Sequence, residues 1–396
     1  MKEISLHIIA YSSHGSGLSG GDRIFIECVR RMTKSNLRIF IYVWDEGYRM
    51  CKRNRLRGVN YVILSMNKYK RLPFPIFDLL LTLKAIIESL RIRSIGTPEK
   101  TVIYSSSEFW MCSIPALILK KKFKAIKWIA TFYLFASNPF SPESPYRGRH
   151  FIRGLLYYFS QWPIYWLIKK YADMVWVTNE LDRYKFINGR RLTPDKVIAV
   201  RGGVDTKTPL TIPDPKEKEF DAVFIGRFHP QKGVVELIDI WKMVCNEKPN
   251  AKLAMIGVGE LESQVREKIK RNNLENNIIL FGFKDGVEKL KIFKDSKIVV
   301  HPAIYDSGGM APCEAMACGL PGVSFDLPAL RTYYPKGMLK TPCFDLKGFA
   351  ENILKLLNDQ ELYMKLSKEA IELAKEWDWD KRAKELLDAI NSLIKN

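Results

Sequence analysis

No run of about 18 uncharged apolar residues occurs in this sequence, so no membrane-spanning helix is predicted. The seven cysteines are scattered and form no C-x-x-C pair, which argues against a disulfide framework or a zinc site and fits a reducing cytosol. The first residues, MKEISLHIIAYSSHGSG, indicate a strand and a glycine loop rather than a signal peptide. Together these absences predict a cytoplasmic protein.

Acidic residues are scarce in one half of the chain only. Residues 1–200 carry 33 basic and 14 acidic residues, whereas residues 201–396 carry 30 and 29, so nearly all of the formal charge of +20 lies in the first half. A basic half beside a neutral half suggests an anionic partner on one side: a lipid surface, a phosphorylated substrate or a nucleic acid. General solubility is the simpler explanation of the same charge.

Short β-branched runs alternate with amphipathic helical patterns along the whole chain, which has the length of two ordinary domains. This alternation predicts an α/β protein with two doubly wound, Rossmann-like domains facing across a cleft. A Pro- and Lys-rich break at 205–219 is taken as the linker. The strands are expected near 4–11, 37–43, 59–64, 101–105, 125–131, 173–177, 196–200, 221–226, 251–257, 277–282, 297–301 and 321–325.

The most informative segment is 297–321, KIVVHPAIYDSGGMAPCEAMACGLP, which reads as a buried strand, a glycine loop and a short helix. Asp306 lies in the loop, and Glu314 is expected in the first turn of the helix. In open parallel sheets, ligands bind beyond the carboxyl ends of the strands, where helix N-termini also favour phosphate. Carboxylates suit sugar hydroxyls, so this segment predicts a nucleotide-sugar site.

A second motif, GRFHPQKG at 226–233, follows the first strand of the second half and opens a helix. Arg227 can bridge two phosphate oxygens, and Lys232 adds a point charge. The pair is suited to stabilising the charge on a departing diphosphate. Two ordinary surface cations at a strand–helix turn are the alternative.

A third motif, SHGSGLSGGDR at 13–23, follows the first strand of the first half. Gly20 and Gly21 would let the backbone approach a phosphate at a helix start, although a glycine loop is often only a turn. His14 is a candidate substrate contact or an ordinary structural histidine.

These motifs carry a resemblance. The chain resembles the retaining glycosyltransferases of family 4, which have the GT-B fold. The marks follow one another from end to end: GGDR at 20–23, a GVD turn at 203–205, GRFHPQKG, the two acidic residues Asp306 and Glu314 with seven residues between them, and the tryptophan-bearing C-terminal segment EWDWDKRAKELL.

The resemblance implies an acceptor-binding domain at 1–203 and a nucleotide-sugar-binding domain at 204–377, with the last helix, about 378–396, packing back on the first. It also implies transfer of a hexose with retention of configuration and without a metal or other cofactor. By position, Arg227, Lys232 and Asp306 would be catalytic and Glu314 would bind the ribose. The remaining donor-binding residues would be Gly20, Gly21, Gly282, Phe283, Lys284, Ser307, Gly308, Gly309, Met310 and Ala311.

Three departures from the family pattern stand out. Asp306 occupies a position that usually holds Glu, and Ser307-Gly308-Gly309 replaces the usual glycine-aromatic-glycine. The first-domain histidine that follows a middle strand in many members is missing from WIATFYLFASNPF, and His150 comes late in the chain. Asp378-Trp379-Asp380 has the form of a metal-binding D-x-D but is interpreted as a helix start.

The basic half predicts where the acceptor is found. Residues 147–170 mix terminal cations with seven aromatics, Lys120–Lys122 add charge, and an amphipathic run extends from 72 to 87. Cations and aromatics suit a lipid headgroup region, so we expect a protein peripheral on the inner face of the cell membrane, with a lipid-linked or membrane-borne glycan acceptor. A buried aromatic helix under a charged rim is the alternative. Among other functions, a nucleic-acid binder lacks any recognised motif, and a GT-B sugar epimerase lacks the spaced acidic pair.

Overall fold

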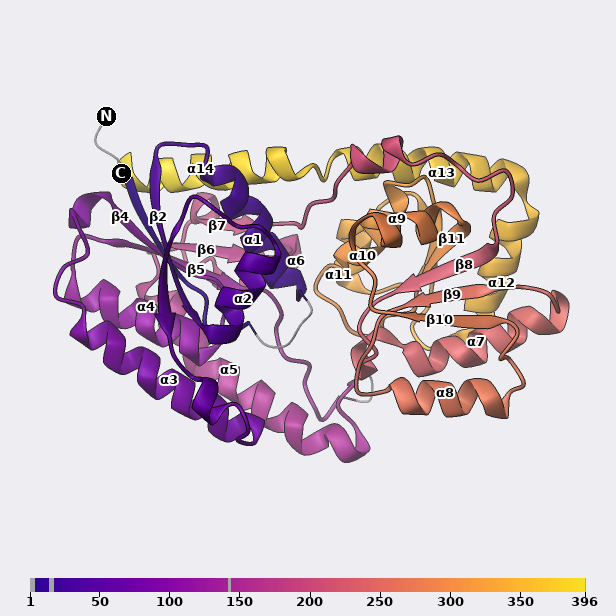
Figure 1. The fold of residues 1–396 in the computed structure, drawn as a ribbon, viewed down its shortest axis with the longest axis horizontal. Coiled ribbons are helices and arrows are strands. Elements are labelled where there is room, and N and C mark those ends of the chain that lie inside the picture. Colours follow the sequence, from indigo (N-terminus) through magenta and orange to yellow (C-terminus); the bar gives the residue numbers. More distant parts are fainter. Residues whose placement is uncertain (1–3, 14–17, 142–143, 396) are drawn as a thin grey trace. The chain divides into compact units, whose positions relative to one another are not determined.

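The structure is a computed structural model that describes residues 4–13, 18–141 and 144–395. It divides into two compact units, each built on one parallel sheet (Figure 1). The first unit comprises Met1–Ala136, Leu155–Gly202 and Trp379–Asn396, and the second comprises Ser137–Gly154 and Gly203–Asp378. Residues 137–154, which the sequence places in the first domain, therefore group with the second unit.

The first unit has a seven-stranded sheet in the order β3-β2-β1-β4-β5-β6-β7, and every pair of neighbours is parallel. The central strands are buried on both faces, which explains their nearly continuous apolar sequences. The strands are β1 (Ile4–Ile9), β2 (Leu37–Trp44), β3 (Asn60–Leu64), β4 (Thr101–Ser105), β5 (Lys127–Phe132), β6 (Met174–Val177) and β7 (Val197–Ala199).

Helices α3, α4 and α5 lie on one side of this sheet, and α1 and α14 lie together on the other (Figure 1). Ser19 caps α1 in a reciprocal capping box with Asp22, and Asn179 caps α6, so both helices begin where their sequences supply a cap. The helices are α1 (Gly20–Met32), α2 (Asp45–Arg53), α3 (Phe74–Arg91), α4 (Trp110–Lys122), α5 (Phe151–Tyr171), α6 (Glu180–Phe186) and α14 (Trp379–Lys395).

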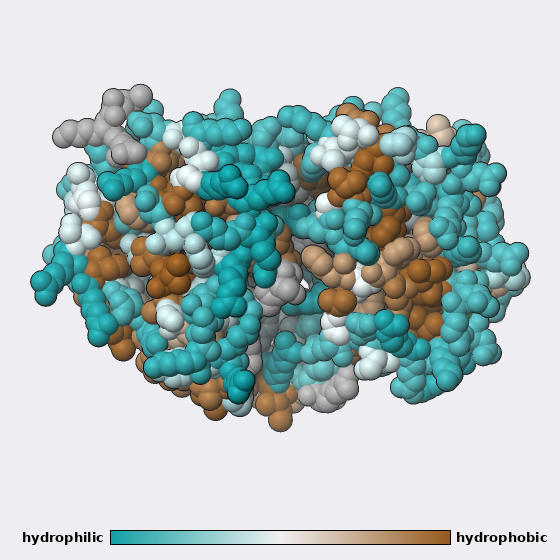
Figure 2. Space-filling model, viewed as in Figure 1, coloured by the Kyte–Doolittle hydropathy of each residue, from teal (hydrophilic) through white to brown (hydrophobic). Residues whose placement is uncertain are grey.

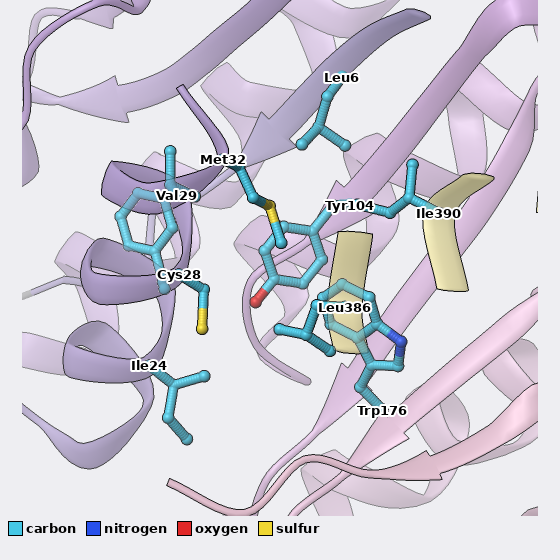
Figure 3. Close-up of a pocket in the computed structure, with 10 residues that line it drawn as sticks. Leu6, Ile24, Cys28, Val29, Met32, Tyr104, Trp176, Leu386 and Ile390 are labelled. Atoms are coloured by element: carbon cyan, nitrogen blue, oxygen red, sulfur yellow. The ribbon is translucent and has the colours of Figure 1, made fainter. Parts of the chain in front are cut away.

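Helix α14 belongs to the first unit although it comes last in the chain. Its apolar side chains face those of α1 and the sheet around a gap of only about 10 Å³, lined among others by Tyr104, Trp176 and Leu386 (Figure 3). A gap of this size holds at most one water, so the interface is close-packed. Asp380, in the first turn, pairs with Arg31 of α1 at 2.6 Å. Asp378–Asp380 is thus a helix start, as expected.

The second unit has a six-stranded parallel sheet in the order β10-β9-β8-β11-β12-β13. All of its expected strands are present, and the sequence missed only the short edge strand β13. The strands are β8 (Phe220–Ile225), β9 (Leu253–Ile256), β10 (Ile278–Gly282), β11 (Ser296–His301), β12 (Gly322–Phe325) and β13 (Met338–Thr341).

Helix α12 packs on α7, and α10 packs on α13. The fully buried Trp241 of α7 is the largest side chain of the core on its side of the sheet. The helices are α7 (Val234–Glu247), α8 (Glu262–Arg271), α9 (Gly286–Lys294), α10 (Met310–Met316), α11 (Pro328–Tyr333), α12 (Leu346–Asn358) and α13 (Gln360–Lys375). The tail from 347 onwards is almost wholly helical, as its sequence predicts.

Candidate donor site in the second unit

The loop after β8 carries the two predicted phosphate-binding cations and is attached to the loop after β11. It contains the short 3-10 helix Pro230–Lys232 and ends at Gly233, whose φ is +61°. A Cβ on Gly233 would lie 1.9 Å from the carbonyl oxygen of Pro302, so only glycine allows this approach. The backbone N–H of Ile304 donates to the carbonyl of Gln231 at 3.0 Å. The GRFHPQKG loop is therefore fixed against the segment that leads to Asp306.

Lys232 and Asp306 are brought into direct contact. The Nζ of Lys232 donates to Oδ2 of Asp306 at 2.5 Å, and Oδ1 accepts from the backbone N–H groups of Ser307 and Gly308 at 2.9 and 3.3 Å. The Asp306 side chain is only 10% exposed. Burial alone would raise its pKa, but Lys232 and the neighbouring His301 more than offset this, and the pKa lies far below its ordinary value. Asp306 is consequently an ionised acceptor at physiological pH.

His301, the last residue of β11, is a site residue that the sequence reasoning missed. Its Nε2 lies 3.4 Å from Oδ2 of Asp306. Burial lowers the pKa of His301 and outweighs the opposing effect of Asp306, so the ring is neutral at pH 7. The signal was present in the sequence, because His301 ends the buried strand KIVVH five residues before the aspartate.

Neighbouring side chains leave no room for a Cβ at the two glycines that follow Asp306. Gly309 has a φ of +71°, and a Cβ there would lie 2.9 Å from Nε2 of His301. A Cβ on Gly308 would lie 2.3 Å from the ring of Tyr333 in α11. Gly308 occupies the position where the family pattern has an aromatic residue, and in this chain the ring of Tyr333 fills the space beside it. Tyr334 donates its hydroxyl to the carbonyl of Gly309.

Glu314 is held separately from the Lys232–Asp306 pair. It is the fifth residue of α10, and therefore lies one turn later than expected. Lys289 of α9, whose side chain is nearly buried, donates to Oε2 of Glu314 at 2.9 Å and to Asp285 at 2.8 Å. The expectation that Glu314 lies in the first helical turn is wrong, because the glycine loop extends to Gly309 and α10 begins only at Met310 with Ala311 next. Lys289 is a further residue that the sequence did not single out.

Arg227 is the exposed member of the cationic pair. In the described part of the chain it has no ion pair or side-chain hydrogen bond. Its charge acts on His229, whose pKa is lowered to about 4 by burial first and by Arg227 second. His229 is therefore neutral at pH 7, and its Nε2 lies 3.4 Å from Oε1 of Glu260. The guanidinium is thus available for an anion.

Residues 137–154 contact the GRFHPQKG loop. The hydroxyl of Tyr146 accepts from Nε2 of Gln231 at 3.0 Å, and Arg153 pairs with Glu260 at 2.9 Å. A Cβ on Gly154 would lie 2.3 Å from Cβ of Tyr146, so the segment turns closely on itself. No sequence signal connected these residues with GRFHPQKG.

Three successive strands of the second sheet end at glycines: Gly226, Gly257 and Gly282. The N–H of Gly257 donates to the carbonyl of Gly282 at 2.8 Å, and a Cβ on Gly257 would lie 1.8 Å from the carbonyl oxygen of Gly226. Gly282 has a φ of +67° and is followed by Phe283, which is 56% exposed. Lys284 pairs with Glu288 at 3.2 Å. At the ends of these three strands the edge of the sheet is therefore bare backbone, next to the exposed ring of Phe283.

In the first unit, the corresponding edge holds tyrosines and a buried carboxyl group. Gly20 and Gly21 are the first residues of α1, and a Cβ on Gly21 would lie 2.8 Å from the ring of Tyr133, which follows β5. The hydroxyls of Tyr133 and Tyr104 lie 3.0 Å apart. Tyr133 stands in the segment where the expected histidine is missing. His14 lies outside the described residues.

Glu108, after β4, is only 4% exposed and accepts from the N–H of Tyr133 at 3.2 Å. Burial, only partly offset by hydrogen bonds, raises its pKa to about 7. The sequence reasoning did not single out Glu108 or Tyr133. Within the described residues, no group of three or more His, Cys, Asp or Glu side chains is placed to hold a metal ion.

Comparison with known proteins gives the family. The pattern of one protein family, Glycosyl transferases group 1, matches residues 210–373, which contain every candidate residue of the second unit described above except those of 137–154. Residues 210–373, about two fifths of the chain, therefore match this glycosyltransferase family. The expected family and the expected enzyme class are confirmed.

Curated relatives of this glycosyltransferase include the poly(glycerol-phosphate) alpha-glucosyltransferase of Bacillus subtilis, which is 23% identical over 57% of this chain and 35% of its own length. An uncharacterised glycosyltransferase of Methanocaldococcus jannaschii is 27% identical over 69% of this chain and 74% of its own. The chain thus spans about a third of the length of the first relative and about three quarters of the second.

Solved structures confirm the fold. A Staphylococcus aureus TarM mutant in complex with Fondaparinux, alpha-GlcNAc-glycerol and UDP has a TM-score of 0.73 at 12% identity, covering 98% of this chain and 100% of that one. Anabaena HepE with UDP-glucose has a TM-score of 0.68 at 14% identity, covering 98% and 100%. At such identities the likeness speaks for the fold alone, and the expected GT-B fold is confirmed.

Proposed function

We propose that this glycosyltransferase moves a hexose from a nucleotide-diphosphate sugar to a membrane-borne acceptor, with retention of configuration and without a metal. The observation that carries the donor half of the proposal is the contact between Lys232 and the ionised Asp306, which come from two loops at one edge of the second sheet. The names of two relatives agree with it: one is an alpha-glucosyltransferase, and the HepE structure contains UDP-glucose.

In this proposal Arg227 and Lys232 bind the diphosphate and stabilise the negative charge that develops as it departs. Asp306, ionised and oriented by Lys232 and two backbone N–H groups, accepts hydrogen bonds from sugar hydroxyls. Glu314, oriented by Lys289, accepts from the two ribose hydroxyls. The stretch 282–284 receives the base, with the exposed Phe283 ring as a stacking surface.

The proposed donor binding is tested by thermal shift with UDP, GDP and ADP and their sugars, because a ligand raises the melting temperature in proportion to site occupancy. One nucleotide is expected to stabilise the chain, and Arg227→Ala and Glu314→Ala are each expected to abolish the shift. Lys355→Ala, an exposed cation of α12, is the control and should leave it unchanged. Absence of any nucleotide-dependent shift would refute the donor assignment.

The membrane-borne acceptor is supported by two exposed apolar stripes on the first unit. Along α3 the side chains Ile76, Leu79, Leu83, Ile87 and Leu90 recur every three or four residues and are all exposed, Leu79 by 60%. Apolar residues of such spacing form one face of a helix, and a soluble protein normally buries it.

The second stripe is on α5, where Leu156, Phe159, Trp162 and Trp166 follow the same spacing and Trp166 is 60% exposed. Figure 2 shows apolar residues along the lower margin of the molecule, where α3 and α5 lie in Figure 1. Exposed cations lie at the C-terminal ends of these helices, Arg91 on α3 and Lys170 on α5, and Lys121 and Lys122 end the neighbouring helix α4.

Helices with apolar faces and basic ends lie in the headgroup region of anionic bilayers, with the apolar side chains in the acyl boundary. In the described residues no helix is long and apolar enough to cross a membrane. We therefore propose that the first unit lies on an anionic cytoplasmic leaflet and takes its acceptor from it. Co-sedimentation with anionic and neutral vesicles at low and high salt tests this, since retention is expected only on the anionic vesicles and should weaken with salt.

A further inference from the structure

A hollow of about 490 Å³ lies at the edge of the first sheet where the strands begin. Lys127 is the first residue of β5, Met174 is the first of β6, and Lys196 immediately precedes β7. Because the strands are parallel, this edge is opposite to the one that carries Tyr133 and Glu108. The volume is in the range of small-molecule pockets.

Cationic side chains dominate the lining of the hollow. It contains four cations, Lys127, Arg190, Arg191 and Lys196, against two carboxylates, and the last turn of α14 closes one side with Ser392 and Leu393. Lys127 and Arg190 make no side-chain ion pair or hydrogen bond in the part of the chain that the structure describes. Two uncompensated cations therefore lie in one concave surface.

The two carboxylates are already engaged. Asp173 accepts from Lys120 at 2.7 Å, from Arg191 at 2.6 Å and from the backbone N–H of Trp128 at 2.8 Å. For Asp195, a hydrogen bond from Thr193 and the charge of Lys196 lower the pKa. Among the described residues, neither carboxylate forms an ion pair with Arg190 or Lys127.

The loop that carries Arg190 is a built structure. The side-chain oxygen of Asn188 accepts from the backbone N–H groups of Arg190, Arg191 and Leu192 at 3.2, 3.1 and 3.1 Å. Gly189 has a φ of +68°, which turns the chain tightly between them. The loop conformation is therefore set without a ligand, which lowers the entropic cost of binding.

We propose that this hollow binds a phosphorylated small molecule. The phosphate of this ligand contacts Lys127, Arg190 and Lys196, and the planar guanidinium of Arg190 donates to two of its oxygens. The rest of the ligand lies against the apolar side chains of Met174 and Leu393. The site goes beyond the proposed transfer reaction, because its lining residues all belong to the first unit and include none of the predicted donor-binding residues.

Isothermal titration of the full chain with a hexose 6-phosphate tests the site, with the uncharged hexose as the matched ligand control. Saturable binding of the phosphate ester and no binding of the hexose are expected. Arg190→Ala combined with Lys196→Ala should weaken the binding at least tenfold. The control pair Arg57→Ala and Lys355→Ala removes the same charge from exposed positions elsewhere and should leave it unchanged.

Hydrogen exchange on the same samples locates the ligand. Protection is expected in residues 186–197, together with circular dichroism spectra that show all variants folded. The proposal is overturned by absence of saturable binding, by equal weakening in the control pair, or by protection confined to the loops after β8 and β11. The first two outcomes leave the proposed sugar transfer intact, since that depends on residues of the second unit.

Discussion

The two units share a parallel sheet but use its carboxyl edge differently. In the second unit the edge is bare backbone at Gly226, Gly257 and Gly282, with an ionised carboxylate held by Lys232. In the first unit the same edge holds the rings of Tyr104 and Tyr133 and the buried carboxyl of Glu108. Glycines and permanent charges suit a rigid, charged ligand such as a diphosphate, whereas side chains that fill the edge leave recognition to their own chemistry.

The two halves of the chain also differ in the charge and the apolar residues that they expose. The first half carries nearly all of the net positive charge and exposes the apolar stripes of α3 and α5, while the second half is almost neutral. The difference teaches that one fold repeated in a chain says little about function by itself. The chemistry lies in what each copy places at its strand ends and on its outer helices.

The largest expected effect is on catalysis in the second unit. Lys232→Ala should lower the rate of sugar transfer by about 10²–10³-fold, because it removes charge stabilisation of the leaving diphosphate and the cation that orients Asp306. Turnover with a radiolabelled nucleotide sugar measures it, and Lys355→Ala is the charge-matched control. Near-normal turnover of the Lys232→Ala variant would contradict the proposal that the charged carboxyl edge of the second sheet stabilises the leaving diphosphate.

The next effect is on pH-dependent stability and distinguishes the first unit. The pKa of Glu108 is raised from 4.5 to about 7, so the folded state holds its proton more tightly than the unfolded state does. The stabilisation that protonated Glu108 contributes is fully present below pH 4.5. It is lost as the pH rises towards and through 7, and the free energy of unfolding falls by up to about 3 kcal/mol. Glu108→Gln should abolish this loss between pH 5 and 8 in urea titrations. An unchanged pH profile in the variant would contradict the assignment.

A smaller effect is expected from the glycines of the donor edge. Gly309→Ala should lower the free energy of unfolding by more than about 1 kcal/mol, because alanine is strained at positive φ and its Cβ would press on His301. Gly282→Ala is the matched control, since it also has positive φ but meets no atom within 4 Å. Chemical denaturation of both variants measures the difference, and equal losses would mean that contact with His301 contributes nothing.

The smallest effect concerns the apolar stripes of the first unit. Leu79→Glu on α3 should weaken binding to anionic vesicles by about tenfold, because it removes one buried aliphatic side chain and adds a repelled charge. Leu210→Glu, at a highly exposed leucine outside the stripes, should bind like the unchanged protein. Equal weakening by both substitutions would point to net charge rather than to the stripe.

The amino-acid sequence by itself determined the layers and the motifs. Twelve strands, the helical tail, the helix start at Asp378–Asp380 and the cation-bearing loop after β8 were all predicted, because they depend on local periodicity, caps and glycines. It did not predict β13, a short edge strand with too few apolar residues to stand out.

Only the tertiary structure decided which residues of the chain contact one another. It paired Asp306 with Lys232 and His301, gave Glu314 to Lys289, placed the ring of Tyr333 beside Gly308, and grouped residues 137–154 with the second unit. It also decided that the apolar faces of α3 and α5 stay exposed. The physical reason is that periodicity sets which residues share a face, whereas contacts between residues far apart in sequence depend on how whole elements pack.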